Sequence, residues 1–170
     1  MNNVINMIFN IKLKNREILI AGGGRIAERK IKLFLTEDAV IYVISPEVSE
    51  FIQTLSDEGK IELTKRDIEL GDITDKYFMV LCATSDQAVN NMISNICSAK
   101  NILHDNSGDH VNSDIMMTAN VHIDDITIAV STGGNSPEIS KTLKNLLIQD
   151  LDSSEYTFED TIKAIYHKKI

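Results

Sequence analysis

The chain has 170 residues, 43% of them hydrophobic and 25% charged, a composition typical of a globular protein and not of a disordered one. At roughly 150 residues per domain, this length predicts one compact domain with a small addition. Lys and Arg number 17 against 25 Asp and Glu, and the net charge of −8 argues against general binding to nucleic acid or to an anionic membrane. The longest apolar run, residues 77–83, is far too short for a membrane span, and residues 1–6 lack the features of a signal peptide. We therefore expect a soluble, cytoplasmic protein.

The two cysteines, Cys82 and Cys97, form neither a CxxC pair nor a zinc-type cluster. Both stand among apolar residues, which favours small buried side chains in a reducing compartment, with a single disulfide as the alternative. We expect no metal site from them.

The first hundred residues alternate continuous apolar runs with amphipathic segments, in the order β-α-β-α-β-β-α-β. Runs that are apolar throughout are typical of parallel strands covered on both faces. The pattern therefore predicts an α/β fold of the Rossmann-like, doubly wound type. Strands are expected at residues 17–21, 40–44, 61–64, 77–82 and 101–104, and helices at 25–36, at 86–99 with Asp86 as N-cap, and around Val48, Phe51, Ile52 and Leu55.

The pattern changes after about residue 105. A polar loop at 104–114 precedes an extended segment at 115–121 and a strand at 126–130. A glycine-rich loop at 131–137 leads into a helix at 138–151, for which Ser136 is a natural N-cap. Another short helix is expected at 158–166. The long helix is expected to turn four apolar side chains inward: Ile139, Leu143, Leu146 and Leu147.

The first glycine loop lies between a predicted strand and a predicted helix and fits the pattern G-x-G-x-x-A. Its glycines allow a tight turn and close approach of a pyrophosphate, and the helix N-terminus supplies free N–H groups. This context predicts a dinucleotide site formed by Gly22, Gly23, Gly24, Arg25 and Ile26.

The end of the second strand is where such folds hold the adenosine ribose. The sequence there reads Ser45, Pro46 and Glu47, and either Ser45 or Glu47 is a candidate for the ribose contact. No arginine follows the strand to bind a 2′-phosphate, which favours NAD over NADP.

Three segments in order resemble the precorrin-2 dehydrogenase family. Residues 22–30, GGGRIAERK, resemble its GGGxVAxRK motif. Residues 79–86, MVLCATSD, resemble its VIAATDD strand end, which adds Thr84 to the expected cofactor contacts. Residues 128–137, IAVSTGGNSP, resemble its IAISTGGxSP segment. The resemblance covers roughly residues 8 to 150.

The resemblance implies a homodimeric enzyme that oxidises precorrin-2, a tetrapyrrole, to sirohydrochlorin with NAD⁺ in sirohaem biosynthesis. It implies an NAD-binding Rossmann domain at residues 1–109, a dimerisation and substrate segment at 110–150, and a short helical tail at 151–170. Some members also insert Fe²⁺. Only about twenty residues follow the predicted long helix, fewer than a helical domain of that family, which weakens the case for iron insertion here.

The proton-accepting carboxylate departs from the family pattern. Ungapped alignment places Gly108 on the usual aspartate, with Asp109 beside it and Asp105 three residues before it. We expect Asp105, at the end of the fifth strand, or Asp109 to be the catalytic carboxylate, within a polar cluster that includes His104 and His110. The other interpretation of this cluster is a solvated loop without chemistry.

The second glycine-rich loop is the expected substrate contact. Its backbone and hydroxyl donors suit a carboxylate of the tetrapyrrole, in addition to capping the helix that follows. Its members are Ser131, Thr132, Gly133, Gly134, Asn135 and Ser136. Candidate cations for the substrate are Arg25, Arg29, Lys30, Lys141 and Lys144, although a solvated helix face is favoured for Lys144.

Two other functions remain open at this stage. One is a bifunctional dehydrogenase and sirohydrochlorin ferrochelatase. The other is a non-catalytic NAD-sensing regulatory domain, which shares the first glycine loop but has no evident need of the loop at residues 131–137.

Overall fold

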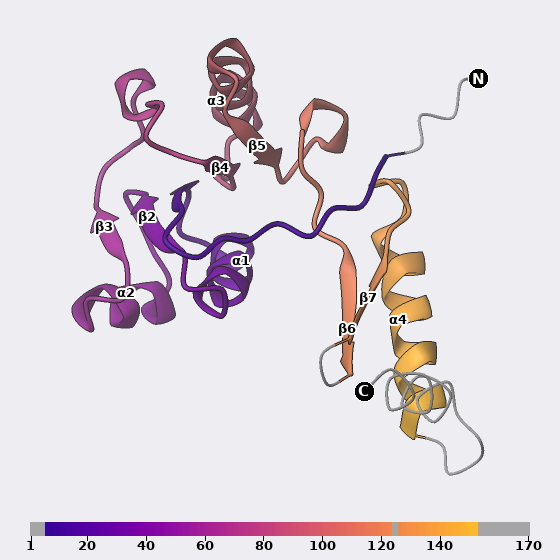
Figure 1. Cartoon of the computed structure of the whole chain (residues 1–170). Coiled ribbons are helices and arrows are strands. Elements are labelled where there is room, and N and C mark those ends of the chain that lie inside the picture. The colour runs from indigo at the N-terminus through magenta and orange to yellow at the C-terminus, as the bar shows by residue number, and fades with distance from the viewer. Residues whose placement is uncertain (1–5, 124–125, 153–170) are drawn as a thin grey trace. The chain divides into compact units, whose positions relative to one another are not determined.

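The computed structural model describes residues 6–123 and 126–152, which divide into two compact units (Figure 1). Residues 10–116 form the first unit. The second combines residues 6–9 with the described residues from 117 onward. The predicted boundary falls between residues 109 and 110 and gives residues 1–9 to the first domain, so the structural division differs at both ends. The predicted helix at 158–166 lies outside the described residues.

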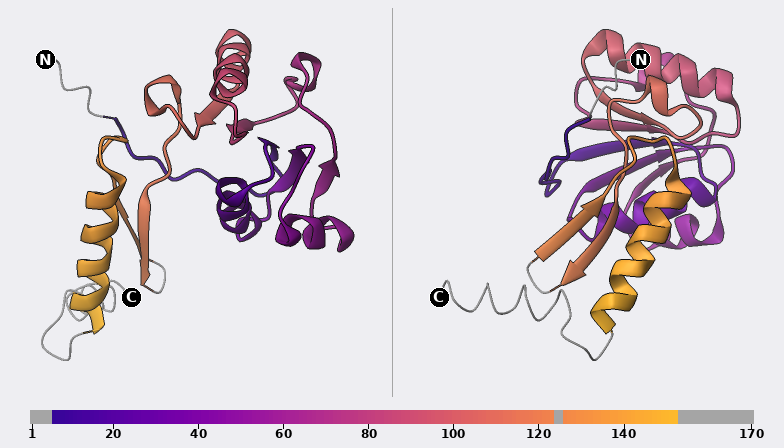
Figure 2. Two further views of the ribbon diagram at one scale, coloured as in Figure 1. Left: turned by 180° about the vertical axis from the view of Figure 1, so that it is seen from behind. Right: turned by 90° about the vertical axis from the view of Figure 1, so that its right-hand side faces the viewer.

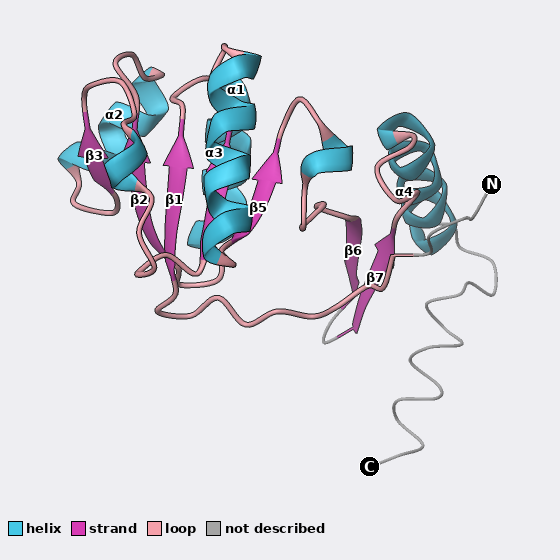
Figure 3. Ribbon diagram, turned by 90° about the horizontal axis from the view of Figure 1, so that it is seen from above, coloured by secondary structure: helices cyan, strands magenta, loops and turns pink. Residues whose placement is uncertain are grey.

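The first unit contains a five-stranded parallel sheet in the order β3-β2-β1-β4-β5, with the strands pointing the same way (Figure 3). This order confirms the predicted Rossmann-like, doubly wound fold. The strands are β1 (Glu17–Ala21), β2 (Val40–Ile44), β3 (Glu62–Thr64), β4 (Met79–Cys82) and β5 (Leu103–Asn106).

Strand β5 begins two residues later than the sequence pattern predicts. Asn101 ends the preceding helix in the left-handed conformation, with φ of 55°, and therefore cannot start the strand. The strand instead continues past His104, where the predicted strand ends, through Asp105 and Asn106.

Helices cover both faces of this sheet (Figure 1). On one face, α1 (Arg25–Leu35) and α2 (Glu50–Asp57) pack on alternate strand residues such as Ile18 and Val43. On the other, α3 (Gln87–Lys100) packs on Leu19 and Val80, and Asp86 caps its first turn as predicted. Burial on both faces explains why the strands are apolar throughout. Two short 3-10 turns, η1 (Leu70–Asp72) and η2 (His110–Asn112), complete the unit.

Cys82 and Cys97 are fully buried, unpaired thiols on the α3 side of the sheet. This confirms the interpretation of the cysteines as small core side chains and excludes the alternative disulfide.

The second unit consists of an antiparallel hairpin and a helix packed beside it (Figure 2). The elements are β6 (Ala119–Ile123), β7 (Ile126–Val130) and α4 (Pro137–Asp152). Strand β6 starts later than the predicted segment at 115–121, because Ile115 packs against the core of the first unit instead. No helix in the described parts of the chain is long and apolar enough to cross a lipid bilayer.

The inner face of α4 differs from the predicted one, because only Leu147 of the four predicted residues is partly buried. Ile139, Leu143 and Leu146 are 54%, 44% and 55% exposed. Contact with the hairpin is instead made on the side of the buried Ser140 and the half-buried Leu147. The sequence pattern correctly finds an apolar stripe on this helix, but the described part of the chain leaves it exposed.

Candidate functional site

The glycine loop joins β1 to α1, next to the ends of β2 and β4. Gly22 adopts φ of +117°, and its N–H donates to the carbonyl of Ile44 over 3.0 Å. A Cβ at Gly22 would lie 2.2 Å from the carbonyl oxygen of Ala83, and one at Gly23 would lie 2.3 Å from that of Glu47. These two positions therefore admit only glycine without movement of the backbone.

Gly24 differs from its neighbours, because a Cβ there would meet nothing within 4 Å. Gly24 is the N-cap of α1, with an extended backbone at φ −87° and no side chain to cap the helix. The first intrahelical bond runs from Glu28 N–H to the Gly24 carbonyl over 3.0 Å, which leaves the N–H groups of the first turn without intrahelical acceptors.

The open N-terminus of α1 suits a diphosphate. It combines unused backbone donors with the positive end of the helix dipole. It also lies where the strand order reverses between β1 and β4, the crevice in which doubly wound folds bind nucleotides. The residues present thus fit the phosphates of a dinucleotide, as the motif predicts.

At the end of β2 the structure separates the two candidates for the ribose contact. Ser45 is 7% exposed, and its hydroxyl donates to the backbone carbonyl of Glu47 over 2.6 Å. Pro46 and the side chain of Glu47 are exposed, and the Glu47 backbone packs on Gly23. The backbone of Glu47 therefore lies beside the glycine loop and its side chain is accessible, whereas the Ser45 hydroxyl is engaged.

Thr84, in the loop after β4, is fixed by a residue that sequence reasoning missed. Buried Asn90 accepts from the Thr84 N–H (3.0 Å) and its Nδ2 donates to the Thr84 carbonyl (3.2 Å). The Thr84 hydroxyl also lies 2.7 Å from Asn90 Oδ1. The signal for this role is a polar residue on the otherwise apolar inner face of α3.

Asp105 lies in β5 and is paired with a buried lysine from α1. Lys30 Nζ is 2.5 Å from Asp105 Oδ2 and donates to Ser107 Oγ over 3.0 Å. Lys30 and Asp105 are 4% and 8% exposed. No group in the described parts of the chain donates a hydrogen bond to the second carboxylate oxygen, Oδ1. Sequence analysis groups Lys30 with cations that face the substrate, and the structure corrects this, because Lys30 faces Asp105.

Asp109 uses both carboxylate oxygens to hold the turn η2. Oδ2 accepts from Asn112 Nδ2 over 2.5 Å, and Oδ1 accepts from the N–H groups of Val111 (3.1 Å) and Asn112 (3.4 Å). The Asn112 side chain, with these backbone donors, lowers the pKa of Asp109. Beside it, a Cβ at Gly108 would lie 1.9 Å from Gln87 Oε1, so the Gln87 amide fills the space that a side chain at position 108 would enter.

The two histidines of the predicted cluster do not join Asp105. His104 is buried, and its Nε2 lies 3.0 Å from the Asn112 carbonyl. Its Nδ1 lies 2.7 Å from Asp114 Oδ2, but outside hydrogen-bonding geometry. Because neighbouring residues of a strand point to opposite faces, His104 and Asp105 face away from each other. His110 is exposed on η2.

The loop between β7 and α4 belongs to the second unit and is held by its own side chains. Thr132 Oγ1 accepts from Ser136 N–H over 3.0 Å, and Asn135 Nδ2 donates to the Thr132 carbonyl over 3.0 Å. Ser136 Oγ accepts from the N–H of Ile139, which confirms the predicted N-cap. Gly133 and Gly134 have φ of +61° and +82°. Ser131 is exposed, and its Oγ accepts from Gly133 N–H over 3.1 Å.

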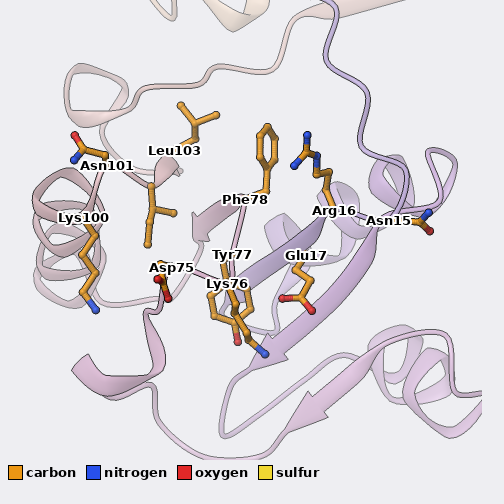
Figure 4. Close-up of a pocket in the computed structure, with 11 residues that line it drawn as sticks. Asn15, Arg16, Glu17, Asp75, Lys76, Tyr77, Phe78, Lys100, Asn101 and Leu103 are labelled. Carbon is orange, nitrogen blue, oxygen red and sulfur yellow. The ribbon is translucent and has the colours of Figure 1, made fainter.

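A separate open cavity of about 560 Å³ lies at the opposite edge of the sheet, where β1, β4 and β5 begin (Figure 4). Its cations are already engaged. Arg16 stacks over Phe78 at 4.9 Å from the ring centroid, and Lys100 Nζ donates to the Ile73 carbonyl over 2.5 Å. Lys76 lies 3.8 Å from the centroid of the Tyr42 ring. Because it lies at the opposite edge of the sheet from the glycine loop, this cavity is distinct from the dinucleotide crevice.

Comparisons with known proteins agree with this geometry. Residues 9–119 match a family model described as "Putative NAD(P)-binding". The precorrin-2 dehydrogenase of Priestia megaterium is 33% identical over 149 residues, which cover 86% of this chain and 73% of that protein. The precorrin-2 dehydrogenase of Bacillus subtilis (strain 168) is 34% identical over 134 residues, which cover 79% of this chain and 82% of that protein.

A solved structure titled "SirC, precorrin-2 dehydrogenase" superimposes with a TM-score of 0.78 and 29% identity, covering 95% of this chain and 78% of that one. The siroheme synthase of Actinobacillus pleuropneumoniae serotype 3 (strain JL03) is 31% identical over 137 residues. That match covers 81% of this chain but only 28% of the synthase, so the chain spans little more than a quarter of that relative.

Proposed function

This chain belongs to the precorrin-2 dehydrogenase family, and from that premise we propose that it oxidises precorrin-2 to sirohydrochlorin with NAD⁺ in sirohaem biosynthesis. The observation that carries the proposal is the glycine loop. Two of its glycines are required by the packing of the loop, whereas the third leaves the N-terminus of α1 bare for a diphosphate. The precorrin-2 dehydrogenase relatives match over most of their own length.

The cofactor end of the site is formed by residues 22–26, Glu47 and the loop at Thr84. When bound, NAD⁺ supplies the hydride acceptor. The exposed Glu47 carboxylate accepts hydrogen bonds from the adenosine ribose hydroxyls. The same negative charge repels a 2′-phosphate, which supports NAD over NADP, and the engaged Ser45 hydroxyl leaves this contact to Glu47.

Asp105 accepts the proton. Oxidation of precorrin-2 removes one hydride and one proton, so the site requires a base as well as a hydride acceptor. Asp105 meets this need better than Asp109, because Lys30 holds one of its oxygens and leaves the other open. Asp109, in contrast, has both oxygens in the hydrogen bonds of η2. The proton then passes from Asp105 to water.

The loop at residues 131–136 binds a carboxylate of the tetrapyrrole. Its fold depends on Thr132, Asn135 and Ser136, whose side chains are bonded within the loop. The exposed Ser131 hydroxyl and the Gly134 N–H are the donors left for a ligand, with Lys141 exposed on the first turns of α4.

The active form is a homodimer assembled through α4. Ile139, Leu143 and Leu146 follow one another at i, i+4 and i+7, so they form one apolar stripe, and all three are exposed. In the same unit, Met7, Ile8 and Phe9 are 75%, 56% and 70% exposed. A second copy supplies a matching apolar stripe. We further propose a cytoplasmic location, since both cysteines are unpaired thiols.

The test is an anaerobic assay with enzymatically generated precorrin-2 and NAD⁺. NADH absorbance and the sirohydrochlorin spectrum should rise together, in proportion to enzyme. Calorimetry with NAD⁺ runs in parallel. Binding of NAD⁺ without turnover would contradict the enzyme assignment and support an NAD-sensing domain.

Iron insertion is the second candidate function, favoured by the similarity to siroheme synthases. Adding Fe²⁺ to the completed reaction tests it. A sirohaem spectrum that forms faster with protein than without establishes the bifunctional enzyme, and an identical rate excludes it.

A further inference from the structure

Lys30 and Asp105 form an ion pair unlike the others found among the described residues. Their side chains are 6% and 11% exposed, whereas every other pair has at least one side chain more than 40% exposed. Lys30 is contributed by α1 and Asp105 by β5, 75 residues further along the chain.

Stability alone does not account for this pair. Removing two charges from water is costly, and an apolar pair of similar volume usually serves a core as well or better. The surrounding face of α1 is apolar, with Ala27, Ile31 and Phe34 buried. Lys30 therefore puts a charge on a buried helix face where an apolar side chain would pack equally well.

The Lys30–Asp105 pair connects the glycine loop, where the cofactor is expected, with the carboxyl end of β5, where the proton is accepted. Helix α1 begins at the glycine loop, and Lys30 lies in its second turn. Asp105 pairs with Leu81 in the neighbouring strand, near the carboxyl edge of the sheet. Ser107 strengthens the connection, because its N–H donates to the Cys82 carbonyl over 3.0 Å and its Oγ accepts from Lys30.

From this geometry, and resting on the proposed function, we propose that Lys30 is a positioning residue for the reaction. It fixes Oδ2 of Asp105 and so aims the open oxygen Oδ1, which accepts the proton, at the substrate. Lys30 itself does not touch substrate or cofactor. During turnover one bond to hydrogen breaks in the substrate to give the proton that forms the O–H bond at Oδ1, and the hydride from the second such bond would go to NAD⁺.

The experiment measures kcat and KM for NAD⁺ for wild type, Lys30→Met and Lys30→Arg, with Lys32→Met as control. Lys32 lies on the same helix but is exposed and paired with Glu28. We expect Lys30→Met to lower kcat about 10- to 100-fold, as a misplaced catalytic group does, with KM for NAD⁺ within about twofold. Lys30→Arg should bring kcat back towards the wild-type value, because the guanidinium can still donate to Oδ2 of Asp105.

A double-mutant cycle separates positioning from folding. If Lys30 acts only through Asp105, then Lys30→Met should change kcat less than about twofold in an Asp105→Asn background. That double variant also removes both buried charges, so it keeps the test usable should Lys30→Met alone unfold. Thermal unfolding of each variant reports the folded fraction.

The outcomes are distinct. If the wild-type protein shows no turnover, both the proposed function and this inference are overturned. Wild-type turnover with Lys30→Met indistinguishable from Lys32→Met overturns the inference and leaves the function standing. Losses of kcat that multiply in the double variant overturn it too, because they show a role independent of Asp105.

Discussion

Gly22 lies directly against Ala83, with its amide bonded to Ile44 and its φ at +117°. This contact joins the turn after β1 to the end of β4 and leaves no room for a methyl group. The turn that begins the dinucleotide crevice is thus also part of the sheet core.

Gly22→Ala should destabilise the protein by about 3 kcal/mol, from the unfavourable φ together with overpacking against the Ala83 carbonyl. Urea unfolding of wild type and variant measures this. Gly24→Ala is the matched control, because its Cβ enters open space, and it should stay within about 1 kcal/mol of wild type. Equal losses in the two variants would contradict the packing described for Gly22.

Gly24→Asp should affect stability and cofactor binding in opposite directions. Position 24 has the extended backbone of an N-cap, and aspartate is a slightly better N-cap than glycine, so α1 should gain about 0.3 kcal/mol. The same carboxylate would stand where the diphosphate binds, and NAD⁺ affinity should fall at least about 100-fold. Calorimetry and thermal unfolding on one preparation give both quantities. NAD⁺ affinity unchanged from wild type would remove the cofactor from this loop.

Asp105→Asn and Asp109→Asn should separate catalysis from loop structure. Asp105→Asn removes the proposed base and should lower kcat at least about 100-fold while sparing NAD⁺ binding. Asp109→Asn keeps an oxygen that can accept from the amides of η2, so turnover should stay within about threefold and stability within about 1 kcal/mol. The reverse ranking of the two kcat values would assign the base to Asp109.

The Arg66–Asp72 pair predicts a pH-dependent contribution to stability. The Arg66 guanidinium contacts both carboxylate oxygens, at 2.7 and 2.5 Å, and lowers the pKa of Asp72. A depressed folded-state pKa means stability that is fully present above the unfolded pKa and lost as pH falls through the folded one. The Tm difference between wild type and Asp72→Asn should hold from pH 7 to 5 and shrink below about pH 4. A difference that persists undiminished at pH 2 would show that the carboxylate charge contributes nothing.

Leu143→Glu should convert the dimer into a monomer. Leu143 stands in the middle of the exposed stripe of α4, and burying one leucine is worth about 1.5–3 kcal/mol before the added cost of a buried charge. Light scattering coupled to gel filtration should give twice the chain mass for wild type and the single mass for the variant. Asn145→Glu, on another face of α4, is the control and should remain dimeric. A wild-type monomer at micromolar concentration would contradict the proposed assembly.

Sequence patterns predict the sheet well because its strands are buried on both faces and therefore apolar throughout. They place β5 two residues too early, because the strand continues through Asp105 and Asn106, whose polar groups are satisfied by neighbours such as Lys30 and Ser113. Residue composition alone cannot distinguish such a strand from a solvated loop.

The candidate site, too, has one part that the sequence predicts and one that it does not. The glycine loop can be predicted because the tight turn requires glycine at neighbouring positions, which are consecutive in the sequence. The pairing of Lys30 with Asp105 joins two distant segments, and a lysine on a helix is ordinarily solvated, so one sequence gives no sign of it. The exposed face of α4 illustrates a third limit, because an apolar stripe is visible in sequence but what covers it is not.

Alkylation of the two buried thiols, Cys82 and Cys97, would report when the structure around them opens. Burial raises the pKa of Cys82 to about 11 and that of Cys97 to about 12, so neither is a reactive thiolate at neutral pH. Cys97 lies on the inner face of α3 and Cys82 lies in β4, which α3 covers, so an alkylating reagent reaches them only when that helix leaves the sheet. Two adducts appearing together would mark a cooperative departure of α3, and adducts appearing one after the other would mark fraying from one end of the helix.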